Sequence, residues 1–212
     1  MQNKETLNIR HSMDLENKIA NLLTASNPEA ARKFFLAWDE ERNASWATAH
    51  LQAKKSAASE RHIPALRGQL RHQLGEEALA KACSISGSGH LAKATEKPGA
   101  HMMMARVGRF ALTSVKVSDR TKLPRESLTR TVLSRPNHKI NPQSEMFSGA
   151  KPDHNDLEEL AYFGCLLAVP SKKDHSAPYG LYLAIPDQGM TCLLYTSPSP
   201  RDQRGSRMPS SA

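Results

Sequence analysis

The first third of the chain places its hydrophobic residues at helical spacing. Leu15 and Ile19 begin a pattern that continues through Leu22 and Leu23, which predicts an amphipathic helix over residues 14–24. Asn27 and Pro28 then form a helix start, because Asn caps free backbone N–H groups and Pro fits the first helical position. We expect this second helix to reach about residue 59. Its buried stripe is marked by Phe34, Phe35, Trp38, Trp46 and Ala49.

A third helix is predicted over residues 65–83, after the break at Pro64. Apolar side chains repeat along one of its faces at Leu66, Leu70, Leu74 and Ala78. Gly75 lies within this helix and weakens it by about 1 kcal/mol relative to Ala, which allows a kink there. Together the three helices predict an α-hairpin or a small bundle.

The middle of the chain changes from linker composition to strand patterns. Residues 84–101 contain a Ser-Gly-Ser-Gly run and a Pro-Gly pair, which are typical of a linker. Residues 102–107 and 110–117 have strand patterns, separated at Gly108. Residues 127–134 are ambiguous, because Pro124 and the Glu126–Arg130 spacing favour a helix, whereas the threonines favour a strand. We expect a helix.

A buried β-hairpin is predicted over residues 162–187. Two apolar runs, 162–169 and 179–185, flank a polar segment, and each run is followed by a proline. A lone hairpin is marginal in water, so the other elements are expected to cover it. Residues 156–160 are expected to form a short helical turn before it.

These elements predict an α+β protein with N-terminal helices followed by a small, mainly antiparallel sheet. The expected organisation is a disordered N-terminus at 1–13, a helical region at 14–83, a Gly/Ser-rich linker at 84–101 and an α+β domain at 102–191. We expect that domain to be truncated at its C-terminus, for the following reason.

The last segment, residues 192–212, reads CLLYTSPSPRDQRGSRMPSSA. It resembles the conceptual translation of a transposase-type sequencing adapter: CLLYTSPSPRD matches the transposon end with its primer extension, and SRMPSSA matches the flow-cell end. Residues 203–205 occupy the position of a sample index. The resemblance implies a non-native tail, which is excluded from fold reasoning and is expected to pack against nothing. The native sequence is then interrupted near Thr191.

Charge and cysteine usage limit the class of protein. The formal net charge is +8, and it falls to +6 without the tail, which holds three arginines and one aspartate. Cys83 and Cys165 then remain as two isolated cysteines, which do not make a disulfide framework and favour a reducing cytoplasm. No apolar run approaches the length of a membrane span. We expect a soluble, cytoplasmic protein without a membrane partner.

Positive charge is concentrated between residues 106 and 139. Nine Lys and Arg residues in this segment are opposed only by Asp119 and Glu126. Cations interleaved with Ser and Thr suit a phosphate-contacting surface, because the charges release counterions and the hydroxyls fix register. The alternative is a solvated basic face. The residues expected to contact nucleic acid are Arg106, Arg109, Lys116, Arg120, Lys122, Arg125, Arg130 and Arg135.

Other chemistries have weaker support in the sequence. The nine histidines lack a short paired spacing, so no metal site or cofactor is expected. The Ser/Gly run at 84–89 lacks the Gly-Lys-Ser/Thr ending of a phosphate loop. Glu158 and Glu159 before one strand and Asp187 after the next are similar to the opening of the restriction-endonuclease-like nuclease motif, whose acid-x-Lys strand would lie beyond Thr191.

The sequence therefore predicts a non-enzymatic nucleic-acid-associated or regulatory protein whose partner is DNA or RNA. The N-terminal helices could also join copies of the chain into a homo-oligomer. A truncated restriction-endonuclease-like nuclease and an antitoxin-like protein-binding module are the alternatives.

Overall fold

The computed structural model describes residues 3–96, 100–140 and 162–197, with side chains from residue 14 onward. Residues 156–160, expected to form a helical turn, lie outside this part of the chain. So do Glu158 and Glu159. In the described residues no helix is both long enough and apolar enough to cross a membrane.

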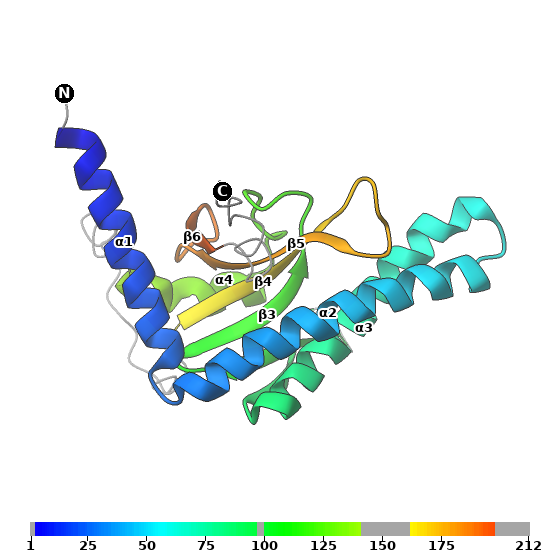
Figure 1. Cartoon of the computed structure of the whole chain (residues 1–212), viewed down its shortest axis with the longest axis horizontal. Helices are drawn as coiled ribbons and strands as arrows, with labels where there is room; N and C mark the ends of the chain where they lie inside the picture. The colour runs from blue at the N-terminus through cyan, green and yellow to red at the C-terminus, as the bar shows by residue number, and fades with distance from the viewer. Residues whose placement is uncertain (1–2, 97–99, 141–161, 198–212) are drawn as a thin grey trace, which may run out of the picture.

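Three helices open the chain: α1 (Asn3–Thr24), α2 (Pro28–Ser56) and α3 (Ile63–Ser86), with the short 3-10 helix η1 (Glu60–His62) between the last two. The start of α2 confirms the predicted cap, since Asn27 Oδ1 accepts a hydrogen bond from Ala30 N at 3.0 Å. Helix α1 begins well before the expected residue 14, within the segment predicted to be disordered. Figure 1 shows α2 and α3 as an antiparallel hairpin that extends past the sheet at its α2–α3 turn.

Six strands form one sheet in which spatial order follows chain order. The strands are β1 (Gly89–Ala94), β2 (His101–Val107), β3 (Phe110–Lys116), β4 (Tyr162–Pro170), β5 (Pro178–Pro186) and β6 (Leu193–Ser197). All neighbours are antiparallel except β3 and β4, which are parallel. The α+β class, with N-terminal helices before a mainly antiparallel sheet, is confirmed (Figure 1).

The parallel pair requires a crossover, which includes helix α4 (Leu128–Ser134) and the 3-10 helix η2 (Arg135–Lys139). Helix α4 confirms the helical interpretation of residues 127–134. Its cap explains why the threonines do not prevent it: Ser127 Oγ accepts from Arg130 N at 3.3 Å, and Thr131 Oγ1 donates to Ser127 O at 3.1 Å.

Both faces of the sheet are buried at β4, which explains the nearly continuous apolar run of this strand. Leu166 and Ala168 face a core shared with α1, α2 and α3, where Phe34, Trp46 and Leu79 are fully buried. Cys165 and Leu167 point to a second core, to which Leu133 of α4 contributes. The apolar face of α2 thus packs against other elements of the same chain. Leu66, Leu70 and Leu74 of α3 are only half-buried.

Two further segments differ from the sequence prediction. The expected linker 84–101 contains the last turn of α3 and all of β1, which pairs with β2 from Gly89 to Ala94. Gly87 ends α3 in a left-handed conformation, so the Gly/Ser run serves as a helix cap and strand start.

The second difference is in the adapter-like tail, where residues 193–197 pair with β5 instead of packing against nothing. Tyr195 packs on the core shared with the N-terminal helices. The physical reason is that β5 would otherwise present an open edge. Leu193, Tyr195 and Thr196 provide a β-prone sequence that pairs with such an edge whatever its origin.

Gly75 allows α2 and α3 to pack closely. Helix α3 continues through it without a break, and a Cβ built there would overlap the guanidinium of Arg42 on α2. Arg42 is 2 % exposed and its Nη1 donates to Arg71 O at 2.9 Å. The glycine therefore provides space for a buried side chain rather than a kink.

We expect Gly75→Ala to lower the free energy of unfolding by roughly 1–3 kcal/mol, because the added methyl must displace Arg42. Gly68 is the matched control on the same helix, since a Cβ there meets nothing within 4 Å. Gly68→Ala should raise stability by up to about 1 kcal/mol through helix propensity. Urea denaturation measures both, and a stabilising Gly75→Ala would contradict this packing.

Candidate nucleic-acid interface

The eight predicted contact residues do not form one surface. The basic segment includes strand β3, with Arg109 just before the strand and Lys116 at its end. The rise per residue of a strand separates these two residues by about 20 Å. Arg106 lies on β2, paired in register with Ala111 near the same end as Arg109. Arg109 is fixed by backbone hydrogen bonds to Leu22 O at 3.0 Å and from Tyr162 N at 3.1 Å.

Arg125, Arg130 and Arg135 lie on the crossover, farther along the chain than Lys116. Arg125 is exposed before α4, and its carbonyl accepts from Arg130 Nη1 at 2.7 Å. Arg135 begins η2, whose buried Asn137 bonds the backbone of Phe163 and Pro186. The crossover thus leads Arg135 back toward the start of β4.

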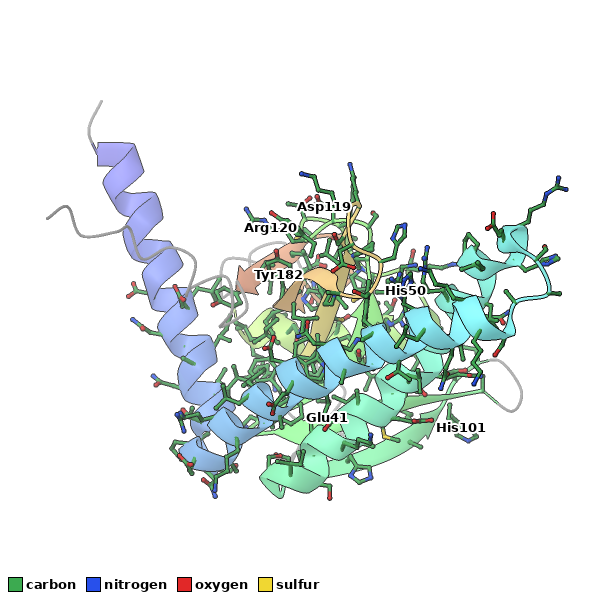
Figure 2. All side chains as sticks on the ribbon, turned by 45° about the vertical axis from the view of Figure 1, so that its right-hand side comes forward. Glu41, His50, His101, Asp119, Arg120 and Tyr182 are labelled. Atoms are coloured by element: carbon green, nitrogen blue, oxygen red, sulfur yellow. The ribbon has the colours of Figure 1, made fainter. Side chains whose placement is uncertain are left out.

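Lys116, Arg120 and Lys122 remain together at the other end of the sheet. Because β3 and β4 are parallel, the loops that follow them, 117–127 and 171–177, start at the same end of the sheet. There Lys116 pairs in register with Ala168. Val117 N also donates to Ala168 O at 3.2 Å. Figure 2 shows Asp119 and Arg120 on the same side of the molecule as His50 of α2.

Side chains of α2 and α3 lie near Lys116 at this end of the sheet. We call the set made of His50, Lys54, Arg67, Arg71, Lys116 and His175 the cationic cluster. The ring centroids of His50 and His175 lie 6.4 Å apart, and Arg71 Nη2 donates to His175 O at 2.6 Å. These contacts join α2, α3 and the 171–177 loop. The sequence shows Arg67–Arg71 and His50–Lys54 at helical spacing, but it does not show that they face β3.

Electrostatic shifts show that the members of the cluster act on one another. Burial, followed by Arg71 and Arg67, lowers the pKa of Lys116. Burial lowers the pKa of Arg71 to about 10, with a further contribution from Arg67. Burial also lowers the pKa of His50, with contributions from four positive or titratable neighbours: Lys54, Arg67, His175 and Arg71. The cluster thus holds like charges close together.

Acidic residues nearby are used to brace the loops. Asp119 Oδ1 accepts from Thr121 N and Oγ1, both at 2.8 Å, and Asp174 Oδ1 accepts from Ser176 N at 2.7 Å and Oγ at 2.6 Å. Hydrogen bonds from Thr121 and Ser176 lower the pKa of the respective carboxyl groups. Of the ion pairs found in the described ranges, none includes Lys54, Arg67, Arg71 or Lys116.

Asp187, Cys83 and Cys165, which are candidates for nuclease or nucleophilic chemistry, have structural surroundings. Asp187 Oδ1 accepts from Thr191 N at 2.6 Å and Cys192 N at 3.1 Å, so this carboxylate closes the β5–β6 turn. Burial raises the pKa of the Cys83 thiol to about 11 and that of Cys165 to about 12, which disfavours a thiolate nucleophile. Within the part of the chain that the structure describes, no three His, Cys, Asp or Glu side chains gather at a possible metal site.

Comparison with known proteins provides no relative: no family model, no curated protein and no solved structure matches this chain.

Proposed function

We propose that the protein is a non-enzymatic nucleic-acid-binding protein that contacts the phosphate backbone of DNA or RNA. The contact surface consists of the cationic cluster and the flanking loops 117–127 and 171–177. It retains Lys116, Arg120 and Lys122 from the sequence prediction and adds residues of α2, α3 and the β4–β5 loop.

The observation that carries the proposal is the convergence at one end of the sheet of positive charges that have no ion-pair partner among the described residues. Without Arg125 and Glu126, which lie at the α4 end of the first loop, the two loops hold four Lys and Arg residues against two acids. The cluster adds Lys54, Arg67, Arg71 and Lys116 without a carboxylate of its own. Polyanionic phosphate is the complement to such a surface, since Lys and Arg release its condensed counterions. The exposed Lys172 and Lys173 and the loop hydroxyls extend the surface.

Salt dependence tests this function. Binding of a fluorescent DNA duplex should weaken steeply with salt, with a log–log slope of roughly −0.9 for each phosphate neutralised. Fluorescence anisotropy from low to physiological salt measures that slope, and an RNA duplex of the same sequence provides a second substrate. If the folded protein binds neither duplex at low salt, the proposed function is wrong.

A further inference from the structure

Helix α2 carries a row of nitrogen-bearing side chains at four-residue spacing: Trp38, Arg42, Trp46 and His50. Each has a buried nitrogen without a hydrogen-bond partner among the described residues, namely Trp38 Nε1, Arg42 Nε, Trp46 Nε1 and His50 Nδ1. Buried polar groups are nearly always paired in folded proteins. Three of these nitrogens are obligatory donors, so the α2 side of the helix hairpin holds several buried donors that lack an acceptor among the described residues.

Arg71 lies where this row meets the cationic cluster. Its guanidinium carbon lies 3.7 Å from the centroid of the Trp46 ring, and its Nη2 donates to His175 O at 2.6 Å. Arg71 is only 4 % exposed, and its Nε has no partner in the described ranges. Stacking and a hydrogen bond thus fix a planar cation whose Nε is left without an acceptor among the described residues.

Like charges surround Arg71, and no ion pair found in the described ranges includes it. Arg67 stands one helical turn before it on α3, and Lys116 approaches from β3. His50 lies on the α2 side, where Lys54, Arg67, Arg71 and His175 are the positive or titratable groups that act on it and Asp174 is the acid. An anion bound among these groups would relieve their repulsion.

We infer that the cationic cluster is a receptor for a phosphate monoester dianion, held by Arg67, Arg71, Lys116 and His50. This inference rests on the proposed function and deepens it, because it assigns the cluster to a strand's terminal phosphate and the flanking loops to internal phosphates. A terminal phosphate carries a charge of about −1.5 to −2 near pH 7, whereas a phosphodiester carries a single charge. The convergence of several cations favours the more highly charged group.

Inorganic phosphate is the first probe, with binding measured by isothermal titration calorimetry at constant ionic strength. Arg67→Gln and Lys116→Gln should each weaken phosphate binding about tenfold, the effect of losing one charge-assisted contact. Arg109→Gln removes the same charge at the opposite end of β3 and should leave the affinity unchanged within twofold. If folded wild-type protein does not bind phosphate, or if all three variants lose affinity equally, the inference is wrong.

The imidazole of His50 gives a second measurement that a purely structural role would not change. Burial, followed by nearby positive charge, lowers its pKa in the free protein, and the negative charge of a bound dianion should raise it. Proton NMR of the histidine rings with and without phosphate measures this shift. His138 on η2 provides a control ring whose NMR signals should not change when phosphate is added. If phosphate binds and leaves the titration of His50 unchanged, the assignment of His50 is wrong.

Matched oligonucleotides then separate this inference from the proposed function. A strand with a 5′-phosphate should bind more tightly than the same strand with a 5′-hydroxyl, by about tenfold. Equal, salt-dependent binding of both strands without binding of inorganic phosphate would overturn the inference and leave backbone binding intact. Binding of inorganic phosphate without either strand would support the dianion site, assign it to a free phosphomonoester and overturn the nucleic-acid function.

Discussion

Replacement of Asn137 by Leu is expected to lower the free energy of unfolding by about 3 kcal/mol or more. Asn137 is fully buried in η2, and its side chain makes three hydrogen bonds to backbone. Nδ2 donates to Phe163 O at 2.9 Å and to Pro186 O at 2.7 Å, and Oδ1 accepts from Phe163 N at 2.8 Å. Leu would leave all three groups buried and unpaired, at a cost of about 1–3 kcal/mol each.

Asn21 provides the matched control for this variant. It is exposed on α1, so Asn21→Leu should change the free energy of unfolding by no more than about 0.5 kcal/mol. Chemical denaturation monitored by circular dichroism measures both variants. Equal effects of the two variants would show that the hydrogen bonds of Asn137 do not stabilise the packing of the crossover against β4 and β5.

Gly108→Ala is the second variant with a large expected effect, a loss of about 2–5 kcal/mol. Gly108 turns the chain between β2 and β3 with φ of 54°, a left-handed conformation that costs other residues about 1–2 kcal/mol. A Cβ there would overlap the carbonyl oxygens of Leu22 and Leu23 at the end of α1. This backbone cannot move aside cheaply, since Arg109 N also donates to Leu22 O at 3.0 Å. Overpacking adds about 1–3 kcal/mol.

Gly87 separates the two contributions to this effect. It has φ of 71° at the end of α3, and a Cβ there meets nothing within 4 Å. Gly87→Ala should therefore show only the conformational cost of about 1–2 kcal/mol. If thermal and urea unfolding give the same loss for both variants, α1 does not pack on the β2–β3 turn as described.

Local signals were sufficient to predict much of the fold. The cap at Asn27, the helix at 127–134 and the hairpin at 162–187 each depend on neighbouring residues, which the sequence displays directly. The parallel pairing of β3 with β4 depends on residues separated by the crossover, so no local pattern indicates it. Strand β1 was hidden in a Gly/Ser-rich composition because its pairing with β2 outweighs weak strand propensity.

The candidate site was predicted only in part, for the same physical reason. Charge clustering indicated Lys116, Arg120 and Lys122, but β3 and the crossover carry the rest of the basic segment away from them. Arg67 and Arg71 reach the site through the packing of the helix hairpin on the sheet. Trp38, Arg42, Trp46 and His50 recur at four-residue spacing, which could have indicated that one side of α2 carries polar nitrogens among its apolar side chains.

We propose that one end of the sheet, and not the whole basic segment, contacts nucleic acid. Two double variants of equal charge change test it: Arg120→Gln with Lys122→Gln in the loop after β3, and Arg106→Gln with Arg109→Gln at the opposite end. Both pairs belong to the original sequence prediction, so only their positions in the fold distinguish them.

The measurement is the slope of log affinity against log salt for a DNA duplex, determined for the wild-type protein and both double variants. The Arg120/Lys122 variant should flatten the slope by about one to two units, while the Arg106/Arg109 variant should keep the wild-type slope. Equal flattening in both variants, or flattening only in the Arg106/Arg109 variant, would contradict the placement of the interface at the cationic cluster.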